Sequence, residues 1–161
     1  MGGRWHLRAL LLWLALMAGA YWGFAHYLSP RVVTATLTTS GQVEIPRSRD
    51  GHYYLQGAIN GQTLVFMVDT GASAVSVSAE FARRAGLPAG YPTRFETANG
   101  SRRGEVVAGQ TVMAGGLTVA PIEVAVGLEL ERPDLALLGQ SFLRHVTVIQ
   151  DGDRLILRPR S

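Results

Sequence analysis

The chain has 161 residues, of which 47% are hydrophobic and 17% charged, so it can form one domain with a buried core, and disorder is not expected. All 15 basic residues are arginine. Without Arg4 and Arg8 the chain has 13 arginines and 12 acidic residues, and this net charge of +1 argues against a nucleic-acid-binding protein. The absence of cysteine excludes disulfides, thiolate metal ligands and a cysteine nucleophile.

The histidines do not suggest a metal site either. The four of them occur at spacings that match no local metal-binding motif; they are His6, His26, His52 and His145. We therefore expect no metal and no cofactor.

The first element in chain order is an apolar segment. Ala9–Leu28 is 20 residues long without a formal charge, which at about 1.5 Å per helical residue is enough to cross a hydrocarbon core of about 30 Å. Arg4 and Arg8 precede it, a charge bias that favours a cytoplasmic N-terminus and an exported C-terminal domain. Residues 1–28 are therefore predicted to be a tail and a transmembrane anchor.

A cleaved signal peptide is the competing interpretation of this segment. The small residues Ala18–Ala20 follow a short apolar run, as a cleavage site would. The apolar character continues for eight residues beyond Ala20, to Leu28, where a mature soluble protein usually turns polar, so the anchor is favoured. A buried core helix fits poorly with so long an uncharged run at a basic terminus, and both remaining interpretations export the domain.

Residues 29–50 are predicted to be a linker. This stretch contains two prolines and many serines and threonines, with only patchy alternation of apolar and polar residues. We expect it to lead into a first strand near Val43–Ile45. The folded domain is then assigned to residues 51–161.

A β-hairpin is expected next. The runs His52–Ile59 and Gln62–Val68 read as strands, and Asn60 and Gly61 between them form the strongest two-residue turn signal, because both central positions of a type I′ turn need a positive φ.

A short strand and a helix follow the hairpin. Val75–Ser78 alternates as a strand does, and Ala79–Leu87 shows helical spacing of its apolar residues. Ser78 is expected as the N-cap, Glu80 suits the first turn, and Gly86 ends the helix.

The rest of the chain is predicted to be mostly strands. A second Asn-Gly turn lies at Asn99–Gly100, a last hairpin is expected around Asp151–Asp153, and a short helix is expected at Gln140–Arg144. Many short strands with one or two short helices indicate a small mainly-β domain, a barrel or a sandwich. No internal repeat is evident in the sequence.

The stretch LVFMVDTGAS, Leu64–Ser73, is the strongest chemical signal. It places one carboxylate, Asp69, directly after an apolar strand and before a sharp turn that contains Gly71. Aspartate is also a common turn residue, so a purely structural role for Asp69 is the alternative. Serine or metal hydrolysis is weakly supported, since neither Ser73 nor Ser141 has a histidine near it in sequence or lies in a G-x-S-x-G motif.

Two motifs together resemble a known family. The segments FMVDTGASAVSVS, Phe66–Ser78, and LALLGQSFL, Leu135–Leu143, look like those of the single-domain retropepsin-like aspartic proteases, specifically their membrane-anchored bacterial branch. The resemblance covers about Gly51 to Arg158. It implies a single retropepsin-like β-barrel domain after one N-terminal transmembrane helix, in a bacterial inner membrane with the catalytic domain on the periplasmic side.

The resemblance also implies roles for individual residues. Asp69 matches the catalytic aspartate, Thr70 the residue whose hydroxyl ties two active-site loops together, and Gly71 the amide close to the carboxylate. The residues that complete or support the active-site loop are Ala72, Ser73, Leu137, Leu138 and Gly139, and those that match the substrate-covering flap are Ala98, Asn99 and Gly100. Viral members carry an acid where this chain has Ser73, and this flap has no aromatic residue at its tip, so substrate contacts there are left open.

The chemistry implied by the resemblance needs two carboxylates. Two such groups about 3 Å apart share one proton, so that one accepts a proton from a water and the other donates to the substrate carbonyl. No second D-T-G or D-S-G occurs, and the other aspartates lie in turn contexts, namely Asp50, Asp134, Asp151 and Asp153. The second carboxylate is therefore expected from another copy of the chain, in a symmetric homodimer.

The leading interpretation is an exported, membrane-anchored, homodimeric aspartic endopeptidase that hydrolyses peptide or protein substrates. The alternative is a catalytically silent module of the same fold that binds peptides or partner proteins at the cell envelope. Neither interpretation includes nucleic acid as a partner.

Overall fold

The computed structural model describes residues 3–28, 35–38, 41–97, 100–129 and 132–160, in two compact units, Met1–Arg31 and Val32–Ser161. The first unit is the helix α1, Gly3–Leu28. Its segment Trp5–Tyr27 is long and apolar enough to cross a membrane. This length and composition fit the expected anchor, and they also fit a signal sequence.

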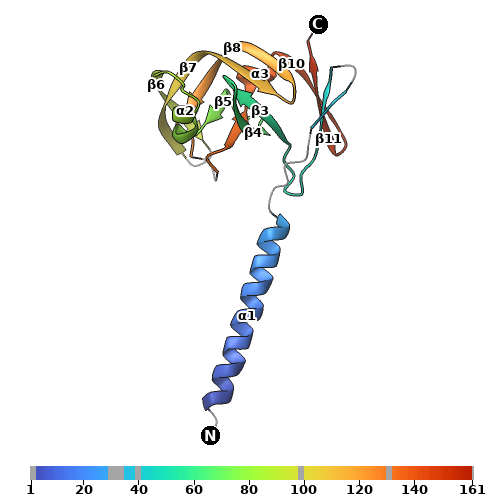
Figure 1. The fold of residues 1–161 in the computed structure, drawn as a ribbon, viewed down its shortest axis with the longest axis vertical. Coiled ribbons are helices and arrows are strands. Elements are labelled where there is room, and N and C mark those ends of the chain that lie inside the picture. The colour runs from blue at the N-terminus through green and yellow to red at the C-terminus, as the bar shows by residue number, and fades with distance from the viewer. Residues whose placement is uncertain (1–2, 29–34, 39–40, 98–99, 130–131, 161) are drawn as a thin grey trace. The chain divides into compact units, whose positions relative to one another are not determined.

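The second unit is mainly β, as expected, and contains two short helices (Figure 1). Its helices are α2, Ala79–Arg84, and α3, Gln140–Leu143. Its strands are β1 Thr36–Leu37, β2 Val43–Pro46, β3 Tyr54–Ile59, β4 Gln62–Val68, β5 Val75–Val77, β6 Tyr91–Thr97, β7 Gly100–Ala114, β8 Leu117–Val126, β9 Leu135–Leu138, β10 Val146–Asp151 and β11 Arg154–Pro159.

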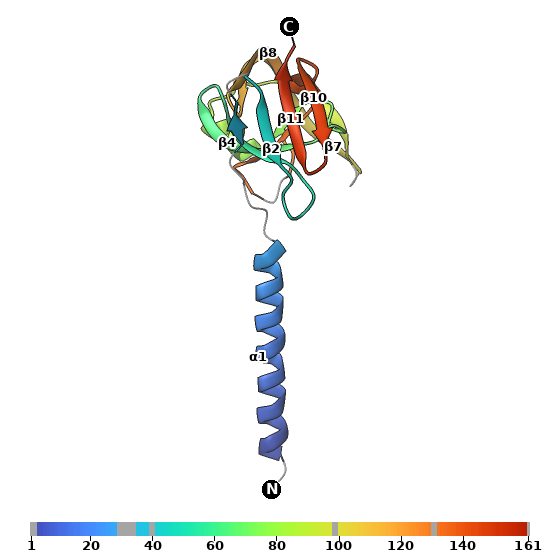
Figure 2. The same ribbon diagram turned by 90° about the vertical axis from the view of Figure 1, so that its right-hand side faces the viewer.

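The strands form two sheets. A seven-stranded sheet has the order β3-β4-β9-β5-β8-β7-β6, and an additional pairing of β3 with β7 closes part of it on itself like a barrel. A four-stranded sheet has the order β1-β2-β11-β10, and Figure 2 shows β2, β11 and β10 side by side. The strand β9 lies between β4, to which it is parallel, and β5, to which it is antiparallel.

The local turn and cap predictions are confirmed. Asn60 and Gly61 have φ values of 49° and 85° and join β3 to β4. The Ser78 hydroxyl accepts a hydrogen bond from the Phe81 amide at 3.1 Å, so Ser78 is the N-cap of α2. Both features follow from backbone groups close in sequence, which is why local residue types predict them.

The boundary between linker and domain is different from the expected one. Strand β2 lies within residues 29–50 and pairs with β11 in the register Glu44↔Ile156, while the side chains of Val43 and Ile45 are fully buried. The strand expected near Val43–Ile45 is therefore present, but it belongs to the core. Its partner strand lies more than a hundred residues later, so local composition did not show that this segment is part of the domain.

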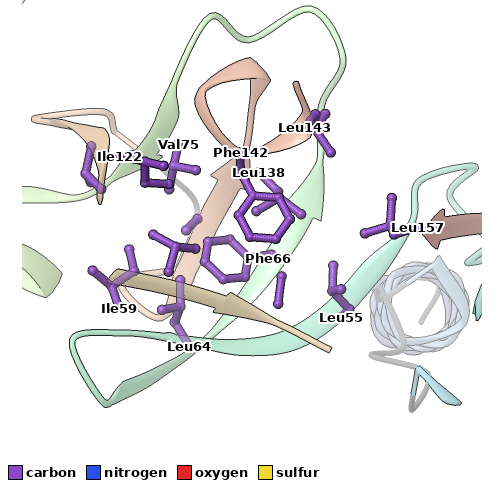
Figure 3. Close-up of a cluster of buried hydrophobic side chains, with 14 of the residues drawn as sticks. Leu55, Ile59, Leu64, Phe66, Val75, Ile122, Leu138, Phe142, Leu143 and Leu157 are labelled. Atoms are coloured by element: carbon purple, nitrogen blue, oxygen red, sulfur yellow. The ribbon is translucent and has the colours of Figure 1, made fainter. Parts of the chain in front are cut away.

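The core explains which face of β4 is buried. Leu64 and Phe66 point inward with Leu138 from β9 and Phe142 from α3 (Figure 3). Because side chains alternate along a strand, Val65 and Met67 point to the opposite face and are only half-buried. Asp69 continues this second alternation, so its side chain is directed away from the core.

Candidate active site

The D-T-G loop begins where β4 ends. Val68 is paired with Leu138 of the parallel strand β9, and the Asp69 amide donates a hydrogen bond to the Leu138 carbonyl at 3.2 Å. The Asp69 side chain is half-buried. The backbone that leads into this carboxylate is thus fixed by a neighbouring strand rather than by the loop alone.

The loop turns back on the Asp69 carboxylate. The Gly71 amide donates to Asp69 Oδ1 at 2.9 Å, and the Ala72 amide donates to the Asp69 carbonyl at 3.3 Å. Thr70 and Ser73 are exposed on the outside of the turn. A Cβ atom at Gly71 would lie 3.2 Å from Asp69 Oδ1, so this residue type leaves room for the oxygen and its amide bond.

Gly139 lies in close contact with the same loop from the other side. A Cβ atom on Gly139 would come within 2.3 Å of the Ala74 carbonyl oxygen and 2.7 Å of the Ala72 carbonyl oxygen. These are backbone atoms, which cannot move without displacing the loop. The predicted supporting segment Leu137–Gly139 therefore does lie against the loop, and glycine is required at its end.

The support of the Asp69 loop is completed by Gln140 and Ser141, which follow Gly139 in the sequence. The motifs did not single out these two residues. The Gln140 amide donates to the Ala72 carbonyl at 2.8 Å, and Gln140 Nε2 donates to the Thr70 carbonyl at 2.9 Å. The buried Ser141 hydroxyl accepts from the Val75 amide at 2.8 Å and donates to the Glu123 carbonyl at 2.9 Å. Their position directly after Gly139 was the only signal in the sequence that could have indicated these roles.

An apolar surface adjoins the loop. Val65 and Met67 of β4 are paired with Leu135 and Leu137 of β9, and all four side chains are half-buried on the face toward which Asp69 continues. We call these four residues the outer β4–β9 face. Side chains of this size are usually buried more fully, so the face is a candidate for contact with another molecule.

A small polar cluster lies beside the end of β4. The Val68 amide donates a hydrogen bond to the Tyr53 carbonyl at 2.9 Å. Asp50, three residues before Tyr53, accepts hydrogen bonds from the Tyr54 hydroxyl at 2.7 Å and from the His52 amide at 3.0 Å. Partial burial acts to raise the pKa of Asp50, but these hydrogen bonds outweigh it and hold the pKa below its usual value. Asp50 is thus an ionised, anchored carboxylate.

Comparison with known proteins identifies the family. The sequence profile described as gag-polyprotein putative aspartyl protease matches residues 55–145, which include the Asp69 loop and Gly139. The crystal structure of a retropepsin-like aspartic protease from Rickettsia conorii is similar, with 34% sequence identity and a TM-score of 0.62 over 73% of this chain and 89% of that chain. This chain belongs to the retropepsin-like aspartic protease family.

Two further relatives of this retropepsin-like chain are uncharacterized proteins. One, from Rickettsia prowazekii (strain Madrid E), is 32% identical in an alignment that covers 92% of this chain and 69% of that protein. The other, from a Sinorhizobium species, is 31% identical in an alignment that covers 81% of this chain and 58% of that protein.

The flap predicted for the retropepsin-like fold falls on the hairpin of β6 and β7. Thr97 is paired with Gly100, whose φ is 101°, while Ala98 and Asn99 lie outside the described residues. At the side of this hairpin Arg102 Nη1 lies 2.6 Å from Glu129 Oε2, an ion pair that joins β7 to the segment after β8.

A groove of about 660 Å³ lies at the other end of β4 in this retropepsin-like domain. It is lined by the first residues of β4, by Arg84 and Asp134, and by the turn between β7 and β8, and not by Asp69. A hydrogen bond from Arg132 lowers the pKa of Asp134, so this carboxylate is engaged in a local ion pair. Among the described residues, no group of three or more metal-ligating side chains is placed to hold a metal ion.

Proposed function

We propose that this chain is a membrane-anchored aspartic endopeptidase whose active site is formed by Asp69 from two copies of the chain. One observation carries the proposal. The Gly71 amide orients the Asp69 carboxylate, and Gly139 and Gln140 support the loop that carries both residues. One chain thus supplies one oriented carboxylate of the proposed dyad.

The other aspartates of the described chain have different partners or positions. Asp50 accepts hydrogen bonds from Tyr54 and His52, and Asp134 accepts from Arg132 at 2.5 Å and 3.1 Å. Asp151 and Asp153 lie at the turn between β10 and β11. A second copy of Asp69 related by a two-fold axis is the remaining source of a matched carboxylate.

The outer β4–β9 face supports the same arrangement. It is apolar, half-buried and continuous with Asp69, so a second copy that covers it would bring the two Asp69 loops toward one another. Thr70 is exposed at the outside of the loop, where its hydroxyl could bond across the two-fold axis. Anchoring both copies in one membrane raises their effective concentration and favours pairing.

The proposed reaction is hydrolysis of a peptide bond by a water held between the two carboxylates. The ionised carboxylate accepts a proton from the water, the water oxygen attacks the carbonyl carbon, and the protonated carboxylate donates its proton to the carbonyl oxygen. The amide nitrogen then accepts a proton as the bond to carbon breaks. Such a pair titrates as a unit, so we expect a bell-shaped pH dependence centred on the acid side.

Substitution of Asp69 by asparagine tests the proposal. The full-length protein in detergent is assayed on a quenched fluorescent peptide library at acidic pH, with Asp151→Asn at the exposed β10–β11 turn as the matched control. We expect Asp69→Asn to lose turnover at least about a hundredfold while the circular dichroism spectrum and melting temperature stay the same. Equal turnover in both variants would rule out the proposed chemistry.

The oligomeric state gives a separate check. Chemical crosslinking of the full-length protein in liposomes should trap a dimer, and the trapped fraction should rise with an inhibitor that mimics the tetrahedral intermediate. A protein that stays monomeric under both conditions has no second carboxylate and cannot use this mechanism.

A further inference from the structure

One edge of the strand β8 is open over its first residues. On one side of β8, residues 117–119 pair with β7. On the other side, β5 pairs only with residues 124–126, and the Ser141 hydroxyl donates to the Glu123 carbonyl. Among the described residues, no pairing or hydrogen bond reaches residues 117–120 from this second side.

The open edge has backbone groups that can form hydrogen bonds. In an antiparallel pair, alternate residues direct both their N–H and their C=O groups toward the partner strand, so the residues between them direct theirs away from it. Pro121 ends this stretch, because proline has no amide hydrogen to donate. An added strand would therefore be four or five residues long, about 13–17 Å at about 3.3 Å per residue.

A groove of about 450 Å³ runs along this open edge. It is lined on one side by the consecutive residues 116–120, and on the other by His145, Val146, Pro159 and Arg160. Side chains on one face of a strand come from alternate residues, so a groove that contacts consecutive residues lies along the edge of the strand. Its volume is within the range of about 300–1,000 Å³ that is usual for ligand sites.

The two faces of β8 differ along the groove. Leu117 and Val119 are half-buried and pack against the core, whereas Thr118 and Ala120 are exposed. Side chains of neighbouring strands share the two faces of the sheet, so an added strand would direct alternate side chains to the core side, where the buried Val146 lines the groove. A segment that alternates apolar and polar residues therefore fits this edge.

The groove also favours one sign of charge. Arg160 is exposed, and no carboxylate of the described residues lies within ion-pair distance of its guanidinium. His145 is exposed as well, and the described residues that line the groove include no aspartate or glutamate. The polar residues of a bound segment are therefore expected to be acidic, because a carboxylate complements Arg160 and a lysine or arginine would be repelled.

We propose that the open edge of β8 binds an extended acidic segment of another protein by strand addition. The added strand forms main-chain hydrogen bonds with residues 117–120, its apolar side chains contact Val146, and a carboxylate contacts Arg160. The Asp69 loop does not line this groove, so the site is distinct from the proposed active site, and binding there does not depend on peptide hydrolysis.

Strand addition is tested with a fluorescent peptide in which three valines alternate with three glutamates between Gly-Ser ends. It is added to the full-length Asp69→Asn protein in detergent, so that no probe is cleaved. Hydrogen exchange followed by mass spectrometry should show that amides of residues 117–120 exchange at least about tenfold more slowly with the peptide bound, because pairing protects them. Of two peptides N-methylated at alternate sets of amides, one should bind at least about tenfold more weakly by fluorescence anisotropy.

The role of charge is tested by reversing it at Arg160. Arg160→Glu should weaken binding of the glutamate peptide about tenfold and strengthen binding of a peptide with lysine in place of glutamate. Arg158→Glu is the matched control, since it makes the same change of charge at an exposed residue that does not line the groove, and it should change both affinities less than about twofold.

Three outcomes would overturn the proposal. One is equal effects of the Arg160 and Arg158 substitutions, and another is unchanged exchange of residues 117–120 when the peptide is bound. The third is protection of these residues that rises with protein concentration and not with peptide, because a second copy of the chain would then occupy the edge.

Discussion

The position of the Asp69 carboxylate depends on backbone groups of residues that are far away in the sequence. Gly71 donates to its Oδ1, but the turn that carries Gly71 is itself held through the carbonyls of Thr70 and Ala72 by Gln140. Gly139 permits this contact because it has no side chain. The orientation of the Asp69 carboxylate thus depends on glycine at position 139 and on the backbone and side-chain amides of Gln140.

Gly139→Ala is expected to destabilise the fold. The added Cβ atom would lie 2.3 Å from the Ala74 carbonyl oxygen, so the loop or α3 must move, at a cost of about 3 kcal/mol in the free energy of unfolding measured by urea denaturation. Gly71→Ala is the matched control, because its Cβ meets only a side-chain oxygen at 3.2 Å and should cost less than about 1 kcal/mol. Equal losses in the two variants would contradict the close packing at Gly139.

Gln140→Met is expected to act on pairing of the chains more than on their stability. The variant keeps the length of the side chain but loses the donor to the Thr70 carbonyl, an exposed hydrogen bond worth about 1 kcal/mol or less. Because Thr70 would lie at the proposed two-fold axis, the dimer dissociation constant measured by analytical ultracentrifugation should rise about fivefold. Gln150→Met, on an exposed position of β10, should leave it unchanged.

At the scale of elements, sequence reasoning succeeded where a feature depends on neighbours along the chain. The Asn60–Gly61 turn, the Ser78 N-cap and the short helix that begins at Gln140 are all confirmed. Each is determined by the φ preference or the hydrogen-bonding capacity of one or two residues.

Features that depend on distant partners could not be derived in this way. The pairing of β2 with β11, the additional pairing of β3 with β7 and the contacts of Gln140 and Ser141 join segments far apart in sequence. Neither alternation nor residue type specifies which strand lies next to which. The D-T-G triplet and Gly139 were predicted to lie together only because a family resemblance supplied the pairing.

The segment between β2 and β3 gives a pH-dependent prediction. Its hydrogen bonds hold the pKa of Asp50 below its usual value, so they stabilise the folded state above the unfolded pKa of about 3.9, and this stabilisation is lost as pH falls through the lower folded value. Tyr54→Phe removes the hydroxyl that donates to Asp50 and should cost about 1.5 kcal/mol at pH 7.

The difference between wild type and Tyr54→Phe should shrink as pH falls through the folded-state pKa of Asp50, because the carboxylate is then protonated in the folded state as well as in the unfolded state. Urea denaturation at a series of pH values measures it. Tyr91→Phe, at an exposed tyrosine of β6, is the control and should have little effect at any pH. A cost that stays constant with pH would mean that lost packing, and not the carboxylate, is responsible.

At the scale of the whole molecule, the proposed dyad predicts how activity depends on composition of the dimer. When wild type and Asp69→Asn are mixed in equal amounts and allowed to exchange, a quarter of the dimers contain two intact carboxylates. Activity per total protein should therefore fall to a quarter of that of the wild type, and not to half, because mixed dimers lack one carboxylate. A fall to half would indicate that each chain acts alone.

The contacts that support the Asp69 loop also determine at what stage of synthesis and folding the loop can form. Gln140 and Thr70 are 70 residues apart, and Ser141 and Val75 are 66 residues apart, so the loop is completed only after the second half of the domain has been synthesised and folded. Contacts at such separation form slowly because a long stretch of chain must be ordered first. During synthesis the nascent chain therefore carries Asp69 on an unsupported turn, and the loop gains its supporting hydrogen bonds only after the residues up to Ser141 have been made and have folded.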